Sequence, residues 1–266
     1  MTNISQKKYL SQVFLNTTVP CEQLASLLTK EGVDSVLEIG PGKGILTGVL
    51  LKQGFSVTSV EKDERFVDYL NKHFQKEIAE KKLTVIHHDI LTFDLEAWRA
   101  RKGQNLSICG NIPYNISTPL VELLLPQLEF LRISALLVQL EFAQRLCSPP
   151  GTRNYGSLSV FTQLRSDPKF EFEVDRSLFT PIPKVDSAII SLKYKKQEAE
   201  IELLKTVEKL TKAAFSQRRK KLSNALSRVL TEEQKLKLHA IDFSLRPESI
   251  TPKEYLEIAK IIRSKE

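Results

Sequence analysis

The sequence has few cysteines and no arrangement of them that indicates a metal site. Cys21, Cys109 and Cys147 lie far apart, and no Cys-x-x-Cys pair with nearby histidines offers the ligand spacing of zinc. His87 and His88 follow an apolar strand pattern without a carboxylate motif, so we expect no bound metal. Three scattered thiols fit a reducing compartment better than a disulfide framework.

Long hydrophobic segments are also absent. The longest apolar runs, such as residues 135–138, are far shorter than the roughly 20 residues that span a bilayer as a helix. The first twenty residues contain Lys7 and Lys8 but no apolar core of signal-peptide length. We therefore expect a cytoplasmic protein without membrane association. Nothing in the sequence indicates an obligate dimer, so a monomer is expected.

Acidic residues are the minority among the charged ones. The 266-residue chain has 39 Lys and Arg against 32 Asp and Glu, a formal net charge of +7. Such an excess favours a polyanionic partner through phosphate neutralisation and counterion release, although many basic proteins bind no nucleic acid. Residues 197–266 hold 15 of the basic residues against 11 acidic ones, so the C-terminal part carries more than its share of the excess.

The first 140 residues alternate between strand and helix patterns. Such alternation predicts right-handed βαβ units around a parallel sheet, and ligands of such sheets bind beyond the carboxyl ends of the strands. The predicted strands are 36–39, 56–60, 83–86, 106–109 and 133–140, and the predicted helices are 45–53, 65–80 and 118–125.

The pattern changes from about residue 170. Two alternating runs, 170–174 and 187–192, flank a proline-rich turn and predict an antiparallel hairpin added to the sheet. After the charged stretch 193–200 the chain has a helical pattern throughout. We expect an α/β domain with a mostly parallel sheet over residues 1–196, followed by a small all-helical domain over residues 197–266.

A glycine-rich turn and two acidic residues follow successive strands. Gly40, Gly42 and Gly44 come directly after the first strand, where glycine permits positive φ and a close approach of a ligand. Glu61 ends the second strand and suits the two hydroxyls of a ribose, while Asp89 follows the third and suits an adenine amino group. The spacing differs from G-x-G-x-x-G, so a dinucleotide is possible but less favoured than S-adenosylmethionine.

The sequence Asn111-Ile112-Pro113-Tyr114 follows the fourth strand. The exocyclic amine of adenine is a poor nucleophile because its lone pair is delocalised, and acceptors that hold both N–H groups ease methyl transfer. The Asn111 oxygen and a nearby backbone carbonyl would supply them, since Pro113 biases Ile112 to an extended conformation. Tyr114 offers a face to an extruded base. Alternatively, the motif is a strand-to-helix turn capped by Asn111.

These motifs resemble those of the KsgA family, the ribosomal RNA small-subunit adenine dimethyltransferases, over nearly the whole chain. The resemblance implies a Rossmann-like methyltransferase domain that uses S-adenosylmethionine. It also implies transfer of four methyl groups to two adjacent adenines near the 3′ end of 16S rRNA in the 30S subunit, with the cofactor lined by Leu15, Gly40, Glu61, Asp89 and Asn111. The matching segments are 11–15, 37–42, 60–61, 89, 110–119, 155–160, 179–188 and 214–222.

The sequence departs from the family pattern at two positions. Val13 stands where the family has an Asn or His that contacts the cofactor. Valine offers only backbone or apolar contact, so we expect cofactor binding to be weaker by about 1 kcal/mol. Leu140 stands before Glu141 where the family often has Lys. Neither position belongs to the Asn111 motif, so we expect an active enzyme.

Two further features are expected to contact RNA. Phe179, just before the proline-rich turn, would stack on the target base opposite Tyr114; alternatively it is a core residue that closes the hairpin. A basic run in the helical domain would contact phosphates, and Lys7 and Lys8 would extend that surface; alternatively the run is a solvated helix face. The run consists of Arg218, Arg219, Lys220 and Lys221.

Other functions share parts of this pattern. The large-subunit adenine dimethyltransferases of the Erm type have the same cofactor and catalytic motifs, but segments 181–188 and 217–220 favour the small-subunit family. A non-catalytic RNA-binding or ribosome-assembly factor could keep the fold, although the intact Asn111 motif argues against it. A small-molecule methyltransferase would not need a basic helical domain.

Overall fold

The computed structural model describes residues 13–102, 105–195 and 201–264. The chain divides into two compact units, Met1–Ala143 with Lys169–Tyr194, and Gln144–Pro168 with Lys195–Glu266. This division differs from the boundary predicted at residue 196 in one segment. Residues 144–168 group with the helical unit because α8 (Ser157–Arg165) packs against its helices α9 (Ile201–Ser216) and α12 (Pro252–Arg263).

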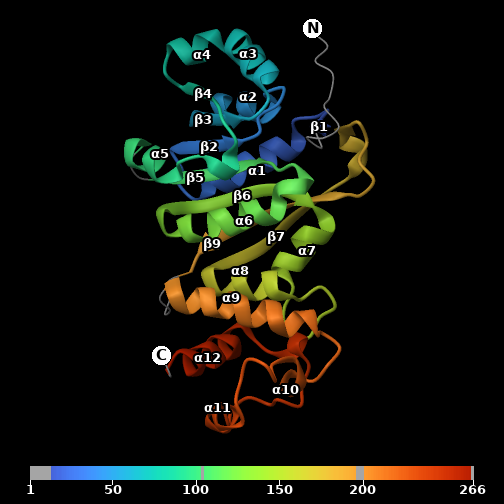
Figure 1. Cartoon of the computed structure of the whole chain (residues 1–266). Coiled ribbons are helices and arrows are strands. Elements are labelled where there is room, and N and C mark those ends of the chain that lie inside the picture. The colour runs from blue at the N-terminus through green and yellow to red at the C-terminus, as the bar shows by residue number, and fades with distance from the viewer. Residues whose placement is uncertain (1–12, 103–104, 196–200, 265–266) are drawn as a thin grey trace. The chain divides into compact units, whose positions relative to one another are not determined.

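The first unit is built on a seven-stranded sheet (Figure 1). The strand order is β4-β3-β2-β5-β6-β9-β7; the pairs from β4 to β6 are parallel and β9 joins β6 antiparallel. The predicted fold class, a mostly parallel sheet with an antiparallel addition, is confirmed. The strands are β2 (Ser35–Ile39), β3 (Ser56–Glu61), β4 (Leu83–His87), β5 (Leu106–Asn111), β6 (Leu131–Gln139), β7 (Ser166–Val174) and β9 (Ser187–Tyr194).

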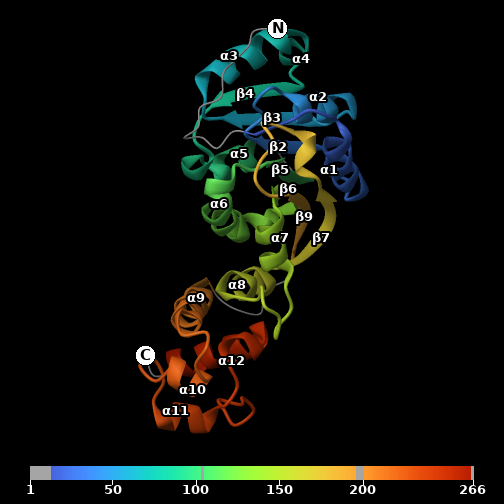
Figure 2. The same cartoon turned by 90° about the vertical axis from the view of Figure 1, so that its right-hand side faces the viewer.

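Helices cover both faces of this sheet (Figure 2). Helices α1 (Val19–Lys30) and α2 (Ile45–Lys52) lie on one face, and α5 (Leu95–Lys102) and α6 (Ser117–Leu124) lie on the other. The remaining helices and 3₁₀ turns are α3 (Glu64–His73), α4 (Gln75–Ala79), α7 (Leu140–Cys147), η2 (Ile90–Thr92), η3 (Tyr114–Ile116), η4 (Leu125–Phe130) and η5 (Arg176–Leu178).

The single helix predicted over residues 65–80 is two helices in the structure. Helix α3 ends at His73 and α4 begins at Gln75, with Phe74 between them at φ −110° and ψ 34°. Phe74 is buried, and its ring lies where a Cβ on Gly44 would be. The break thus accompanies packing of an aromatic ring against the glycine turn.

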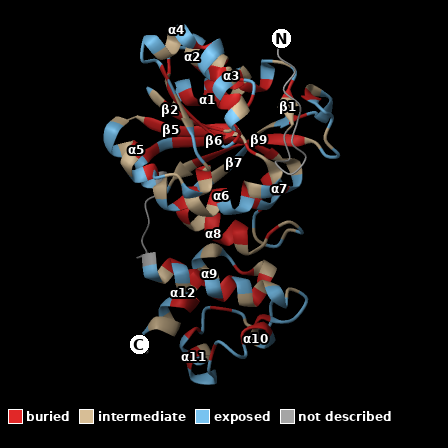
Figure 3. Ribbon diagram, turned by 45° about the horizontal axis from the view of Figure 1, so that its top comes forward, coloured by how far each residue is buried: buried red, intermediate tan, exposed pale blue. Residues whose placement is uncertain are grey.

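Strands covered on both faces are expected to be apolar along their whole length. The central strands follow this rule, and Figure 3 shows their residues almost entirely buried. Some polar side chains interrupt these strands; Thr58 in β3 and Ser134 in β6 are buried without a hydrogen-bond partner among the described residues, whereas others have one. Ser107 in β5, for example, donates its hydroxyl to the carbonyl of Ile133 at 2.6 Å. This bond joins β5 to β6 near their amino ends, away from the carboxyl ends where the pocket lies.

A second, two-stranded sheet was not predicted. Strand β1 (Phe14–Leu15) pairs antiparallel with β8 (Phe179–Thr180), and Leu15 lies opposite Phe179. The amide of Asn16 continues the pairing by donating to the carbonyl of Leu178 at 2.9 Å. Strands of two residues carry no periodic signal, and their partners here are remote in sequence. The pairing anchors the N-terminal segment beside the main sheet.

The second unit has a core of its own. Tyr155 and Tyr255 are fully buried in it; the Tyr155 hydroxyl donates to the carbonyl of Ile250 at 2.9 Å and the Tyr255 hydroxyl to that of Pro247 at 2.8 Å. Residues 201–264 contain no strand, as predicted. The smaller helices are α10 (Leu222–Ala225), α11 (Glu232–Lys237) and η6 (Pro247–Ser249). Among the helices that the structure describes, none could span a membrane.

Gly110 in β5 lies close to the backbone of β2. A Cβ at this position would lie 2.5 Å from the carbonyl oxygen of Ile39, so Gly110→Ala must push two central strands apart. We predict a loss of about 1–3 kcal/mol in the free energy of unfolding, measured by urea denaturation. Gly156→Ala is the control, because its Cβ meets open space at an extended φ. Equal stability of the two variants would contradict the prediction.

Candidate cofactor and catalytic site

A pocket lies at the carboxyl ends of the parallel strands of the first unit. Its walls come from β1, from the glycine turn after β2, and from the residues that end or follow β3, β4 and β5. The structure brings together every residue that the sequence placed at the cofactor, namely Val13, Leu15, Gly40, Glu61, Asp89 and Asn111. Ile112 and Pro113 also line the pocket, whereas Tyr114 and Phe179 are not among its lining residues.

The glycine turn has the backbone conformation that the sequence predicts. Gly40, Gly42 and Gly44 have φ values of 62°, 53° and 77°, a region that side chains with a Cβ rarely adopt. A Cβ on Gly40 would meet nothing within 4 Å, whereas one on Gly42 would lie 2.9 Å from the ring of Phe14. Gly40 therefore leaves open space, and Gly42 admits the aromatic side chain of β1.

Glu61 is held by two backbone amides. Its Oε2 accepts from the amide of Gly42 at 3.1 Å and its Oε1 from that of Asp63 at 2.8 Å. Burial raises the pKa of the Glu61 carboxyl, and these two bonds act against that rise. A carboxylate has about four acceptor positions, so Glu61 keeps acceptor capacity for ligand hydroxyls beside these two bonds.

The pKa of Asp89 is shifted in the opposite direction. Its Oδ2 lies 2.7 Å from Nζ of Lys62, and its Oδ1 accepts from the amide of Leu91 at 3.0 Å, which caps η2 at its N-terminus. The hydrogen bond from Lys62 is the largest cause that lowers the pKa of Asp89. The carboxylate keeps acceptor capacity for an adenine amino group.

Glu38 is a buried acid of the pocket wall to which the sequence analysis gave no role. It is 1% exposed, and the hydroxyls of Thr47 and Ser59 each donate to its Oε2 at 2.7 Å. Burial raises its pKa to about 7. Glu38 thus connects β2, α2 and β3 beneath the glycine turn. Its position as a charged residue within an otherwise apolar strand could have indicated this role from the sequence.

The side chain of Asn111 is fixed by the N-terminal segment. Its Nδ2 donates to the carbonyl of Val13 at 3.1 Å, which leaves Oδ1 as the acceptor of the amide. Val13 therefore orients the Asn111 side chain through its backbone carbonyl, and this contact does not involve the valine side chain. The amide of Ile112 donates to the carbonyl of Leu137 at 2.9 Å, and the carbonyl of Pro113 accepts from the amide of Ile116 at 3.0 Å.

The two aromatic residues expected to stack on a base differ in their surroundings. Tyr114 is half-buried, and its hydroxyl shares a hydrogen bond of 2.9 Å with that of Ser187. Phe179 is 1% exposed and belongs to the core that contains Leu15. The ring of Phe179 has no free face in this conformation. Phe179 is therefore a core residue, which was the alternative interpretation, and we do not propose that it stacks on the base.

The basic run does not lie in a helix, so that part of the prediction was wrong. Helix α9 ends at Ser216, and residues 217–221 form a turn. The guanidinium of Arg218 pairs with Glu248 and donates to the carbonyl of Thr152 at 3.2 Å. This internal pairing gives Arg218 a structural role. Arg219, Lys220 and Lys221 are exposed and have no ion pair among the described residues.

Two smaller predictions concern the histidine pair His87-His88 and the lysines Lys7 and Lys8. A ring nitrogen of His87 lies 3.2 Å from the carbonyl of Lys62, and Nδ1 of His88 lies 2.9 Å from that of Asp89. Within the described ranges, no group of three or more His, Cys, Asp or Glu side chains could hold a metal ion. Lys7 and Lys8 lie outside the described residues.

Comparison with known proteins gives the family. The family model "Ribosomal RNA adenine dimethylase" matches residues 3–264. "Ribosomal RNA small subunit methyltransferase A" of Porphyromonas gingivalis is 35% identical over 99% of this chain and 100% of its own length, and that of Coxiella burnetii is 33% identical over 98% and 100%. The crystal structure of the 23S rRNA methyltransferase ErmE superposes with a TM-score of 0.70 at 25% identity, covering 94% and 99% of the two chains. The chain belongs to the ribosomal RNA adenine dimethylase family.

The buried carboxyl of Glu38 predicts a pH-dependent stability. Because its pKa in the folded protein lies above the ordinary 4.5, its contribution to stability is present below pH 4.5 and is lost as pH rises through about 7. Between pH 4.5 and 8 the free energy of unfolding of the wild type should fall by about 3 kcal/mol relative to Glu38→Gln. Urea denaturation measures this, with exposed Glu64→Gln as control. A constant difference across this range would contradict it.

Proposed function

We propose that this member of the ribosomal RNA adenine dimethylase family uses S-adenosylmethionine to dimethylate N6 of adenosines in small-subunit ribosomal RNA. The observation that carries the proposal is the hydrogen bond from Asn111 to the carbonyl of Val13. Because the side-chain NH₂ group of Asn111 donates to the protein in this bond, its side-chain oxygen can accept a hydrogen bond from a substrate amine. Glu61 and Asp89 line the same pocket.

The pocket residues fit the cofactor. The free acceptor positions of Glu61 would bind the ribose hydroxyls, Asp89 would accept from the adenine amino group, and Leu15 offers an apolar wall. The open space at Gly40 gives room for a ligand against the backbone. The bound cofactor supplies a methyl group on a positively charged sulfur.

The acceptor adenine needs positioning more than a general base. Asn111 Oδ1 would accept from one N–H of the exocyclic amine, and the carbonyl of Ile112 from the other. The carbonyl of Pro113 already accepts from the amide of Ile116, which leaves the Ile112 carbonyl as the second acceptor. Two acceptors on one nitrogen favour a tetrahedral geometry, which makes its lone pair available. Preorganised hydrogen bonds of this kind cost no rearrangement during the reaction.

The small ribosomal subunit is the favoured substrate. Relatives with the small-subunit name match at 33% and 35% identity over nearly the full length, whereas ErmE matches at 25%. We propose the 30S particle as the substrate, two adjacent adenosines near the 3′ end of 16S rRNA as the targets, and a monomer acting in the cytoplasm.

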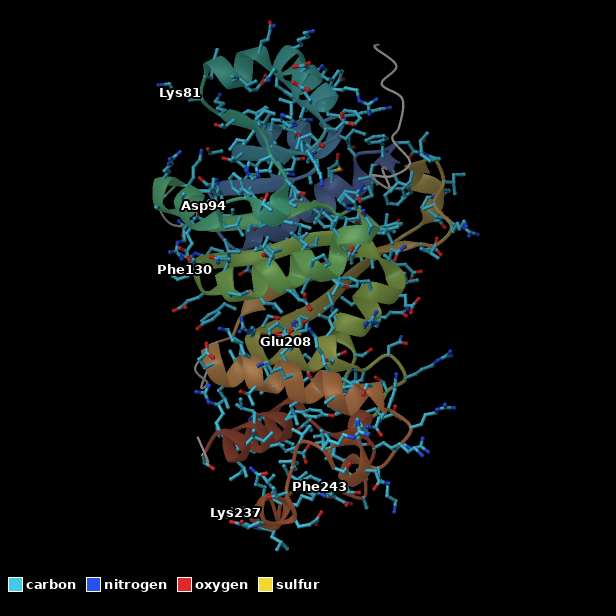
Figure 4. All side chains as sticks on the ribbon, viewed as in Figure 1. Lys81, Asp94, Phe130, Glu208, Lys237 and Phe243 are labelled. Carbon is cyan, nitrogen blue, oxygen red and sulfur yellow. The ribbon has the colours of Figure 1, made fainter. Side chains whose placement is uncertain are left out.

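Within the helical unit, the turn after α9 is the proposed contact with RNA phosphates. Arg219, Lys220 and Lys221 are exposed there, and the amide of Leu222 donates to the carbonyl of Leu245 at 2.7 Å. This bond brings the exposed Arg246 close to the turn. Several other cations of the unit are paired with acids, as Lys212 with Glu208 and Lys237 with Glu233, and Figure 4 labels Glu208 and Lys237.

Methyl transfer to ribosomal particles tests the proposed function. With tritiated S-adenosylmethionine, the wild type should label immature 30S particles that lack the modification, and nucleoside analysis should yield dimethyladenosine. Asn111→Ala should abolish the label because the amine loses its acceptor. Preferred labelling of free 23S RNA would favour the Erm-type activity. Cofactor binding without labelling of either RNA would favour a non-catalytic assembly factor.

Charge reversal in the turn tests the RNA surface. Each phosphate that the protein no longer neutralises should reduce the slope of log K against log salt by about 1. Arg219→Glu combined with Lys220→Glu should therefore weaken 30S binding and flatten that slope by about 2. Lys237→Glu, in the same unit, is the control. An unchanged slope in the double variant would remove the turn from the interface.

A further inference from the structure

Tyr114 and Ser187 come from segments 73 positions apart, and their hydroxyls share a hydrogen bond of 2.9 Å. Tyr114 begins η3, a single 3₁₀ turn of three residues that has no side-chain cap. Ser187 is 1% exposed and is the first residue of β9, opposite Gln139 of β6. A side chain of a short turn is therefore attached to a residue of the main sheet.

The backbone around Ser187 is firmly held. The carbonyl of Asp186 accepts from the amide of Leu140 at 3.0 Å, and its carboxylate accepts from the amide of Arg176 at 3.0 Å. The guanidinium of Arg176 also donates to the carbonyl of Lys184 at 3.2 Å. These bonds fix the C-terminal part of the proline-rich segment, directly before Ser187. Ser187 is therefore the fixed partner of the pair, and its hydroxyl positions the side chain of Tyr114.

The position of Tyr114 relative to the pocket suits a contact with the acceptor base. Pro113 and Asn115 on either side of it line the cofactor pocket, and Tyr114 does not. The backbone of Tyr114 is therefore at the edge of the pocket, three residues after Asn111, and its side chain extends to Ser187, opposite Gln139 at the end of β6. The last side-chain torsion of a tyrosine is broad, and the hydroxyl oxygen lies on its axis, so the hydrogen bond fixes the far end of the ring. Because the phenolic O–H prefers to lie in the ring plane, the same bond also restricts the direction that the ring face takes.

We propose that Ser187 is a positioning residue for the acceptor base: its hydroxyl holds the Tyr114 ring in the orientation that stacks on the adenine presented to Asn111. This inference deepens the proposed function and rests on it. It assigns a task to Ser187, which lies in the segment 179–188 that carries part of the family resemblance. In the sequence analysis, Phe179 was the one residue of that segment with a predicted role. It also requires the hydroxyl of Tyr114 in addition to its ring.

A double-mutant cycle tests the pair. Ser187→Ala and Tyr114→Phe should each lower the single-turnover rate of 30S methylation about fivefold, the equivalent of one hydrogen bond of about 1 kcal/mol. The double variant should lose no more than either single variant, because all three remove the same bond. The dissociation constant of S-adenosylmethionine should stay unchanged in all three. Multiplying effects of the two substitutions would overturn the proposal.

Ser191→Ala is the matched control. Ser191 lies four residues further along β9 on the same face, is 1% exposed, and donates its hydroxyl to Glu171 at 2.5 Å. The substitution removes a buried hydroxyl and its hydrogen bond from the same strand without touching Tyr114. It should leave the methylation rate within twofold of the wild type. An equal loss in Ser191→Ala and Ser187→Ala would reduce Ser187 to a strand-packing residue.

A readout without cofactor or RNA separates this inference from the proposed function. In protein labelled with 3-fluorotyrosine, the ¹⁹F signal of Tyr114 is the one that Tyr114→Phe removes. Ser187→Ala should shift that signal, and Ser191→Ala should not. An unmoved signal in Ser187→Ala would overturn the positioning role. If the wild type labels no RNA while the signal shifts as expected, the proposed methylation fails and the hydrogen bond stands.

Discussion

The hydrogen bond between the Asn111 amide and the Val13 carbonyl joins two segments that are 98 positions apart. It orients the acceptor oxygen of Asn111 and fastens the N-terminal segment at the pocket. Other interactions hold the same segment in place: β1 pairs with β8, and the Phe14 ring packs at 60° to that of Phe66 with centroids 5.4 Å apart. Gly42 must lack a side chain because Phe14 occupies that space. Cofactor pocket and amine acceptor are therefore built by one set of interactions.

Three carboxylates line this pocket, and their surroundings give them different tasks. Glu38 is buried under two hydroxyls, and its pKa is raised to about 7. Glu61 is buried but held by two backbone amides, whereas Lys62 lowers the pKa of Asp89. The first carboxylate connects strands and helix, and the other two keep acceptor positions for a ligand. The net charge of the whole chain does not show that these three carboxylates differ in their pKa and in their contacts.

Much of the fold and of the pocket could be predicted, because local patterns determine them. Buried parallel strands show apolar runs, and the residues after each run reach one edge of the sheet, which is why Gly40, Glu61, Asp89 and Asn111 meet. The features that the sequence patterns did not predict depend on residues that are remote in the sequence. The pairing of Leu15 with Phe179, the burial of the Phe179 ring, and the ion pair of Arg218 with Glu248 have no signal in local spacing. The break at Phe74 was also missed, and the residue that its ring packs against, Gly44, lies thirty residues earlier.

Substitution of Asn111 by Asp tests most directly whether the amide must donate and accept at once. Aspartate keeps two acceptor oxygens and nearly the same size, but it cannot donate to the Val13 carbonyl. The measurement is the single-turnover rate of methyl transfer to 30S particles at saturating S-adenosylmethionine, with cofactor affinity determined by calorimetry. The account predicts a loss of at least about 100-fold, equal to about 2.7 kcal/mol. A rate close to that of the wild type would contradict it.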